Sequence, residues 1–256
     1  MPSTTYLILK EPFRQSPEGR LEGRTTLLHR HFDKHEPNGG RMMGKLVPTL
    51  AVAAVFVAVV ALSIDRATAI GPGAAAKPGL PAPAFNAPDI AGKTVSLGDY
   101  AGKIVILEWT NDGCPFVGKH YNSGNMQALQ RKYTGEGDVW LTIASSAPGE
   151  QGYVTPAEAK ADLARWHAAP TDFLLDPNGI VGRLYGARAT PTMVVINRDG
   201  RVAYIGAIDD TPSTRLADVK TAKNYVIAAL DEIAAGKPVT VTSTRAYGCS
   251  IKYNGA

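Results

Sequence analysis

The hydrophobic pattern separates an N-terminal part without periodicity from a region in which apolar runs and helical periodicities alternate. Short runs rich in β-branched residues predict strands, and stretches with apolar side chains three or four positions apart predict helices. The predicted strands cover residues 103–110, 139–145, 172–175, 192–197 and 201–206. The predicted helices cover residues 115–133, 155–167, 179–185 and 215–235. This alternation, ending in a hairpin and a helix, predicts an α/β domain with a mixed central sheet and helices on both faces.

The N-terminal part of the chain predicts an export signal. Residues 1–41 show no apolar pattern, and we expect an unstructured extension there. Residues 42–69 contain an uncharged run, 46–64, and end in Ala-Thr-Ala, which a signal peptidase accepts. The run is also just long enough to span a bilayer, so an uncleaved membrane anchor is the alternative to a cleaved signal peptide. In both cases we expect the rest of the chain in the periplasm or another extracytoplasmic compartment.

The remainder of the chain predicts a linker and one domain. Residues 70–84 are mostly Gly, Ala and Pro and cannot bury a core, whereas residues 85–256 fit a domain of ordinary size. From Ile70 onward there are 18 Lys or Arg and 17 Asp or Glu, so the formal charge of +4 of the whole chain does not describe the domain. Because no basic patch is interleaved with aromatic residues, we expect no nucleic-acid partner.

The most informative local pattern surrounds Cys114. An apolar run ends at residues 111–113, and Cys114 is followed directly by Pro115, which predicts a strand, a tight turn and a helix start. A thiol at a helix N-terminus meets unpaired amides and the positive end of the helix dipole, which stabilise the thiolate. Cys114 is therefore the candidate nucleophile; the alternative is a small buried hydrophobic side chain at a strand end.

The chain has one other cysteine, Cys249, near its C-terminus. The preceding residues 237–246 alternate Val and Thr without a helical pattern, so they can run extended and bring the tail back across a small domain. Three arrangements are open: a redox-active pair of Cys114 and Cys249, a structural disulfide, and two independent thiols. We favour the redox-active pair because bonds to a cysteine of low pKa are labile.

Four side chains near Cys114 are further candidates. Glu108 shares a strand face with isoleucines, so we expect it to be buried with a raised pKa; a carboxylate that reaches solvent is the alternative. Trp109 is expected in the core or in a wall of the site. Lys119 is expected to be a solvated surface charge. His120 is a weak metal candidate, since copper would need softer or additional ligands, and we expect neither another metal ligand nor a cofactor.

Several motifs in order resemble the thioredoxin-like superfamily. Cys114 at a strand end and Ala-Thr-Pro-Thr at 189–192 match the helix-start cysteine and the cis-proline loop of that fold. The resemblance implies a cis bond before Pro191 and, for Glu108, the position of a buried acid that moves protons to and from the thiols. A narrower resemblance, from about residue 85 to the C-terminus, is to a bacterial peroxiredoxin-like redoxin subfamily related to the alkyl hydroperoxide reductase/thiol-specific antioxidant proteins. The motifs that carry it are Glu-Trp-Thr-x-x-x-Cys-Pro-Phe-Val, Leu-Leu-Asp, Tyr-Gly-Ala-x-x-Thr-Pro, Tyr-Ile-Gly-x-Ile-Asp-Asp and Tyr-Gly-Cys-Ser-Ile-Lys-Tyr.

Two departures from better-known relatives bear on activity. Thioredoxins carry Cys-x-x-Cys, whereas Val117 stands where the second cysteine would be. Peroxiredoxins place their peroxidatic cysteine in Pro-x-x-x-Thr/Ser-x-x-Cys, and Val117 again matches that cysteine. The residues three and seven before Cys114 are Asn111 and Leu107, so the hydroxyl and the proline that shape a peroxide pocket are absent. The resemblance therefore favours thiol–disulfide exchange over peroxide reduction.

The sequence as a whole predicts an exported thiol–disulfide oxidoreductase. Cys114 would attack a protein or small-molecule disulfide, Cys249 would resolve the mixed disulfide, and an unidentified thiol would donate electrons. The residues expected to shape the substrate groove are Thr190, Pro191, Pro115 and Trp109. The alternatives are a peroxidase with the same nucleophile, and a non-catalytic copper- or thiol-binding protein that uses Cys114 and His120.

Overall fold

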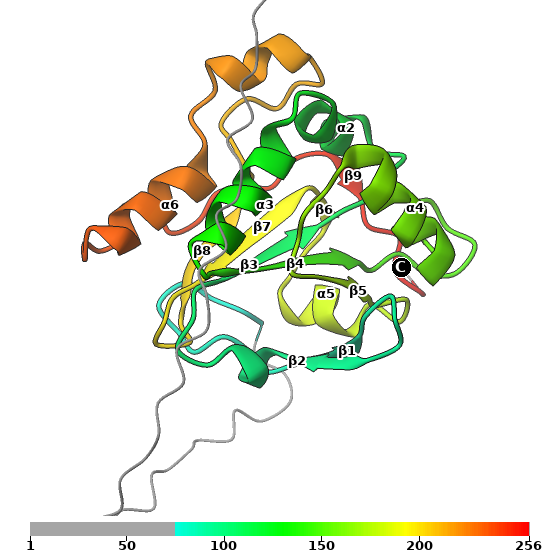
Figure 1. The fold of residues 1–256 in the computed structure, drawn as a ribbon, viewed down its shortest axis with the longest axis horizontal. Coiled ribbons are helices and arrows are strands. Elements are labelled where there is room, and N and C mark those ends of the chain that lie inside the picture. Colours follow the sequence, from blue (N-terminus) through cyan, green and yellow to red (C-terminus); the bar gives the residue numbers. More distant parts are fainter. Residues whose placement is uncertain (1–74, 256) are drawn as a thin grey trace, which may run out of the picture. The chain divides into compact units, whose positions relative to one another are not determined.

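The computed structural model describes residues 75–255 (Figure 1). The predicted extension, the predicted export segment and residues 70–74 of the predicted linker lie outside the described residues. Within 75–255, no helix is both long and apolar enough to cross a membrane. Residues 75–84 lie along the domain, where the backbone amides of Ala76, Gly79 and Ala82 donate hydrogen bonds to it. The folded part therefore begins before the predicted boundary at residue 85.

A five-stranded mixed sheet forms the centre of the domain, in the order β5-β4-β3-β7-β8. Its strands are β3 (Val105–Trp109), β4 (Val139–Ala144), β5 (Asp172–Leu175), β7 (Thr192–Ile196) and β8 (Val202–Gly206). The pairs β3–β4 and β4–β5 are parallel, whereas β3–β7 and β7–β8 are antiparallel. All five predicted strands are present. Every residue of β3 is buried, which explains why its sequence is a nearly continuous apolar run.

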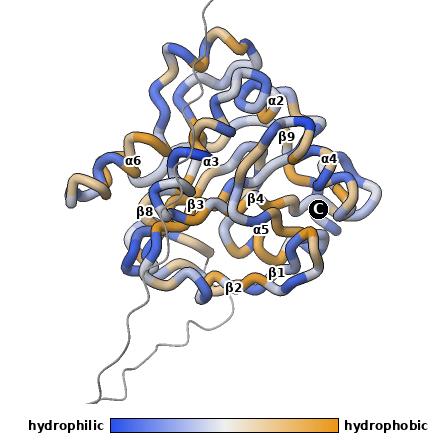
Figure 2. The backbone as a smooth tube through the Cα atoms, in the orientation of Figure 1, coloured by the Kyte–Doolittle hydropathy of each residue, from blue (hydrophilic) through white to orange (hydrophobic). Residues whose placement is uncertain are grey.

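Helices cover both faces of this sheet, as predicted. One face packs against α2 (Pro115–Asn122), α3 (Asn125–Gly135) and α6 (Tyr225–Ala234). The other face packs against α5 (Ile180–Leu184) and is near the hairpin of β1 (Asn86–Pro88) and β2 (Thr94–Ser96), which leads into the 3₁₀ helix η1 (Leu97–Tyr100). The helix α4 (Pro156–Trp166) contributes to a third, smaller cluster. Hydrophobic segments follow the central strands, and hydrophilic ones gather on the outer loops (Figure 2).

Two of the predicted helices are interrupted. The helix expected over 115–133 divides into α2 and α3 at Gly124, which has a φ of 79°, a backbone conformation that glycine adopts without steric cost. The helix expected over 215–235 divides into a 3₁₀ helix, η2 (Leu216–Lys220), and α6. The second helix starts at Asn224, whose side chain accepts a hydrogen bond from the Ile227 amide. The apolar spacing predicted one continuous helix in each region, but residues at the helix boundaries divide each into two.

The C-terminal tail returns across the domain. Residues 237–246 run beside the edge strand β8, where the Ile205 amide donates to the Thr242 carbonyl and the Thr244 amide donates to the Ile205 carbonyl. The chain then forms β9 (Cys249–Ser250), which pairs antiparallel with β6 (Ala189–Thr190). In Figure 1 the red segment of β9 lies close to β6. This pairing brings the tail to the strand end where Cys114 lies.

Candidate functional site

Cys114 is the N-cap of α2, as the sequence predicted. Its backbone is extended, with φ −87° and ψ 117°, and Pro115 is the first helical residue. The thiol donates a hydrogen bond of 3.2 Å to the carbonyl oxygen of Thr190, on the loop before β7. Although it lies at a helix N-terminus, the side chain is only 1% exposed.

Cys249 contacts Cys114 across Thr190. The register of β6 and β9 sets Thr190 opposite Cys249, and the Thr190 carbonyl is the group that the Cys114 thiol contacts. Cys249 packs against the core cluster that contains Cys114, and each thiol shifts the pKa of the other. Both residues are thiols rather than a disulfide in this structure, and Cys249 is only partly buried. The two cysteines of the chain are therefore neighbours.

The two thiols have pKa shifts in opposite directions. Burial raises the pKa of Cys114, but hydrogen bonds from the Cys249 thiol and from the Val117 amide outweigh burial, so its pKa lies below the usual value. Val117 is in the first turn of α2, where amides have no partner within the helix. For Cys249, burial and the hydrogen bond with Cys114 raise the pKa to about 12. When the pair loses one proton, Cys114 becomes the thiolate.

The loop before β7 has the predicted cis bond between Thr190 and Pro191. Both residues are buried, and Pro115 is exposed. The tail passes directly over Thr190 at Gly248, whose φ is 123°; a Cβ atom there would overlap the Thr190 carbonyl oxygen. The surface expected to be a substrate groove is thus covered by the protein's own tail.

Trp109 does not line a groove. Its side chain is fully buried in the core on the opposite face of β3 from Glu108, and its Nε1 donates a hydrogen bond of 3.0 Å to the Ser145 hydroxyl. Of the two positions expected for Trp109, the structure shows the core rather than a wall of the groove, because its side chain packs on the opposite face of the sheet from Cys114.

Glu108 is fully buried, which confirms the expected burial and rules out a carboxylate that reaches solvent. Four side chains donate hydrogen bonds to it: Tyr121 at 2.7 Å, Gln130 at 3.1 Å, Trp140 at 2.7 Å and Thr142 at 3.2 Å. Burial raises its pKa, and these hydrogen bonds lower it by less. Within the described residues, its hydrogen-bond partners do not include a cysteine.

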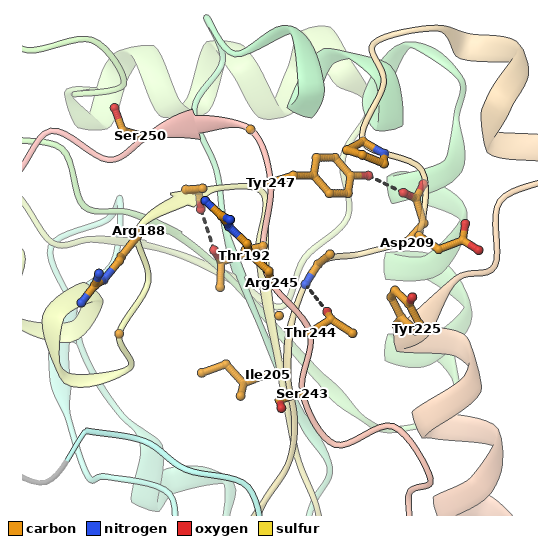
Figure 3. Close-up of a pocket in the computed structure, with 18 residues that line it drawn as sticks. Arg188, Thr192, Ile205, Asp209, Tyr225, Ser243, Thr244, Arg245, Tyr247 and Ser250 are labelled. Atoms are coloured by element: carbon orange, nitrogen blue, oxygen red, sulfur yellow. Dashed lines mark hydrogen bonds between the residues drawn. The ribbon is translucent and has the colours of Figure 1, made fainter.

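Lys119 belongs to a buried polar group, so the expectation of a solvated lysine is wrong. Its side chain is fully buried, and Nζ lies 3.2 Å from the Asp209 carboxylate, 2.8 Å from the Thr211 carbonyl and 3.1 Å from the Tyr247 hydroxyl. The Tyr247 hydroxyl also donates to Asp209 (Figure 3), and burial together with Asp209 raises its pKa well above the usual value. We call Lys119, His120, Asp209 and Tyr247 the Asp209 cluster.

His120 completes the Asp209 cluster. Its Nδ1 accepts a hydrogen bond of 2.9 Å from the Asn125 amide, so Nε2 carries the hydrogen and lies 3.4 Å from the Tyr247 hydroxyl. Burial lowers its pKa to about 4, against the opposing effect of Asp209. Both ring nitrogens have protein partners, and residues 75–255 contain no group of three His, Cys, Asp or Glu side chains placed to bind a metal.

An open pocket of about 1030 Å³ lies beside the tail (Figure 3). The end of β8 and the loop after it form one side, and residues 243–250 contribute the other. Its lining includes Gly248 and Ser250, which flank Cys249, together with Arg188 and Arg245. The pocket exists only because the tail is docked, so sequence pattern alone could not locate it.

The residues that the sequence analysis missed are Asp209, Tyr247 and Gly248. Each lies in a motif that carried the family resemblance, Tyr-Ile-Gly-x-Ile-Asp-Asp or Tyr-Gly-Cys-Ser-Ile-Lys-Tyr. These motifs were a signal that the residues matter. Their contacts with Lys119 and Thr190 join positions far apart in the chain.

A protein-family model, described as the AhpC/TSA family, matches residues 78–205. The chain belongs to the AhpC/TSA family. The matched half contains Cys114 and the cis bond before Pro191, and membership in this family indicates a thiol oxidoreductase with the thioredoxin-like fold. The match ends before Cys249, so any role of the tail rests on this structure.

Two solved structures with TM-scores above 0.5 share the fold of this chain. A hypothetical protein from Sinorhizobium meliloti 1021 has a TM-score of 0.58 at 24% identity, covering 72% of this chain and 98% of that chain. An uncharacterized conserved protein from Geobacillus kaustophilus has a TM-score of 0.59 at 24% identity, covering 70% of this chain and 94% of that chain. A putative thiol:disulfide interchange protein DsbE from Chlorobium tepidum has a TM-score of 0.42 at 28% identity, covering 51% and 85%. A comparison with curated proteins gave no match.

Proposed function

We propose that this chain is a thiol–disulfide oxidoreductase whose redox pair is Cys114 and Cys249. The observation that carries the proposal is the docking of β9 on β6, which sets Cys249 opposite Thr190, the residue whose carbonyl accepts the hydrogen bond of the Cys114 thiol. Membership in the AhpC/TSA family supports thiol chemistry at Cys114. The low pKa of Cys114 supports a redox-active rather than a structural pair, because bonds to such a cysteine exchange readily.

The reaction transfers two electrons between the pair and an external disulfide, R–S–S–R. One protein sulfur displaces R–S⁻ and forms a mixed disulfide with the remaining R–S group. The other protein sulfur then displaces the second R–S⁻, which leaves a disulfide between Cys114 and Cys249. An external thiol donor reduces this disulfide by the same steps in reverse. Neither step needs a cofactor.

The test is the connectivity and the reduction potential of the cysteines. We expect the oxidised protein to contain an intramolecular Cys114–Cys249 disulfide, found by peptide mapping, with a potential above about −300 mV in dithiol buffers. Cys114→Ser and Cys249→Ser should each abolish catalysed reduction of a disulfide substrate. A potential far below that value would indicate a structural bridge, and the absence of the disulfide would overturn the proposal.

Peroxide reduction is the second candidate, favoured by family membership and by the burial of Cys114, which only a small oxidant can reach without movement of the tail. The Cys114 thiolate would take one peroxide oxygen, giving a sulfenic acid and an alcohol or water. Cys249 would then form the disulfide with release of water. Stoichiometric peroxide consumption that is lost in Cys114→Ser would support this activity, and none above the background of that variant would exclude it.

We also propose that the domain acts outside the cytoplasm. The support is the apolar run 46–64 and the Ala-Thr-Ala that follows it, both outside the described residues. An oxidising compartment is where a cysteine pair can form its disulfide. Cell fractionation locates the protein, and N-terminal sequencing separates a signal cleaved before Ile70 from a retained anchor. A protein found only in the cytoplasm would contradict the proposal.

A further inference from the structure

The two sulfurs of the proposed pair differ in access to solvent. Cys114 is 1% exposed and lies where β6 and β9 pair, with its thiol against the Thr190 carbonyl. Cys249 lies on the covering strand and is only partly buried. Of the two cysteines, Cys249 is therefore the more accessible residue in the closed protein.

The covering segment is attached at both ends. We call residues 247–253 the strap. At its start, the Tyr247 hydroxyl donates to Asp209 and accepts from Lys119. At its end, the Tyr253 hydroxyl donates a hydrogen bond of 2.6 Å to the Ala187 carbonyl. The Tyr253 ring occupies space beside Gly179 and Gly182 that a Cβ atom at either glycine would fill.

Backbone hydrogen bonds hold the strap between these two tyrosines. The Ile251 amide donates to the Arg188 carbonyl at 3.0 Å, and the Ala147 amide donates to the Lys252 carbonyl at 2.7 Å. Lifting the strap would break these bonds and remove the Tyr247 hydroxyl from a buried ion pair, which is unfavourable because buried charges need their hydrogen-bonding partners. The strap therefore stays closed over Cys114 while the Asp209 cluster is intact.

We propose that external thiols and disulfides exchange at the Cys249 sulfur, and that Cys114 exchanges only with Cys249. The proposal rests on the proposed function, since it requires the Cys114–Cys249 disulfide. It reverses the order expected from the sequence, in which Cys114 meets the substrate and Cys249 resolves. The greater exposure of Cys249 supplies the approach; the pocket beside the strap is lined by its neighbours Gly248 and Ser250 but not by Cys249 itself.

A thiolate R–S⁻ attacks the Cys249 sulfur of the oxidised protein, a bond between Cys249 and R–S forms, and the bond between the two protein sulfurs breaks. The electron pair leaves with Cys114 as a thiolate, which the Val117 amide at the start of α2 stabilises. A second R–S⁻ attacks the bound R–S sulfur and forms R–S–S–R. Cys249 leaves and takes a proton from solvent, so two external thiols are oxidised and the protein disulfide is reduced.

The experiment identifies the cysteine that carries the adduct. Oxidised full-length protein is mixed briefly with 2-mercaptoethanol, quenched in acid, alkylated and mapped by mass spectrometry. We expect the mercaptoethanol adduct on Cys249 and the alkyl group on Cys114, in at least tenfold excess over the reverse. The reverse labelling, or equal labelling, would overturn this proposal alone. Absence of the starting disulfide would overturn the proposed function and this inference together.

A pair of tyrosine variants tests whether the closed strap causes the preference for an adduct on Cys249. Tyr247→Phe removes the hydroxyl that holds the start of the strap and should increase the share of adduct on Cys114 several-fold. Tyr225→Phe is the matched control, because the Tyr225 hydroxyl has no hydrogen-bond partner within residues 75–255 although the ring lines the same pocket. An equal share of adduct on Cys114 in both variants would contradict the role of the strap.

Discussion

Tyr247, two residues before Cys249, donates a hydrogen bond from its hydroxyl to the carboxylate of Asp209. This contact ties the tail to the loop that follows β8 and to Lys119 on α2, the helix that Cys114 caps. One buried interaction therefore links the position of one cysteine to the helix of the other.

Loss of the Tyr247 hydroxyl should expose Cys114. In a Cys249→Ser background, we expect Tyr247→Phe to raise the rate of Cys114 alkylation by iodoacetamide about tenfold. A hydrogen bond to a charged group contributes about 1.5–3 kcal/mol, and the rate follows the open population when opening is fast. Mass spectrometry over time measures the rate. Equal rates with and without the hydroxyl, or a similar rise in Tyr225→Phe, would contradict the prediction.

Gly248→Ala should slow disulfide formation. The added Cβ would overlap the Thr190 carbonyl oxygen in a backbone conformation that L residues rarely adopt, so β9 must move away from β6. We expect closure of the Cys114–Cys249 disulfide to slow at least tenfold, which about 1.4 kcal/mol of displacement energy would produce. Gly236→Ala is the matched control, because its φ is also positive and a Cβ there meets nothing within 4 Å. If both variants close at the wild-type rate, the close approach has no consequence.

Lys119→Met should destabilise the fold strongly. The substitution leaves the Asp209 carboxylate buried without its cation, and breaking a buried pair on one side costs about 3–5 kcal/mol. Urea unfolding measures this loss in the free energy of unfolding. Adding Asp209→Asn should recover part of it by removing the unpaired charge. A loss below about 1 kcal/mol in the single variant would show that the pair is hydrated rather than buried.

His120 should make stability depend on pH. Because its pKa is about 4 in the folded protein, below the unfolded value near 6.5, the unfolded state binds more protons between these values. Stability should therefore fall as pH decreases from about 6.5 to 4, by up to about 3 kcal/mol from this residue, with Asp209 and Lys119 as the charged groups that face it. The difference between wild type and His120→Gln isolates the effect. If the difference in the free energy of unfolding between wild type and His120→Gln stayed constant from about pH 6.5 to 4, the prediction would be refuted.

Glu108 is proposed to move a proton to or from the cysteine pair. Its raised pKa supports the proposal, although its hydrogen bonds go to other side chains, so any transfer passes through an intervening group. We expect Glu108→Gln to keep the fold and to slow thiol–disulfide exchange tenfold or more. An unchanged rate would remove the relay role and leave Glu108 as a structural acceptor.

The buried carboxyl of Glu108 should also make the free energy of unfolding depend on pH. Since burial raises its pKa, the folded state holds the proton more tightly than the unfolded one. Its contribution is fully present below the unfolded pKa of about 4.3 and is lost as pH rises through the folded pKa. The stability of wild type relative to Glu108→Gln should therefore fall with rising pH above about 4.3, as urea unfolding at several pH values would show.

Much of the fold followed from local sequence. The strands β3, β4 and β7 and the helix α4, which begins with a capping box of Thr155 and Glu158, depend on neighbouring residues, and they were predicted to within two residues at each end. The divisions at Gly124 and Asn224 were missed although both residues are typical helix boundaries, because the apolar spacing continues through them. The site was only half predictable, since the burial of Lys119 depends on Asp209 and Tyr247, which are distant in the chain.

Local signals alone place Cys114 at the start of a helix that follows a buried strand, because the proline, the preceding turn and the apolar run are all adjacent in the chain. The sequence also assigns the loop before Pro191 to the same site, through its resemblance to known redoxins. The position of Cys249 beside Cys114, on a strap held by Tyr247 and Tyr253, follows from tertiary contacts alone. The physical reason is that the docking of the tail depends on burial and charge pairing between segments distant in the chain, which no local pattern encodes.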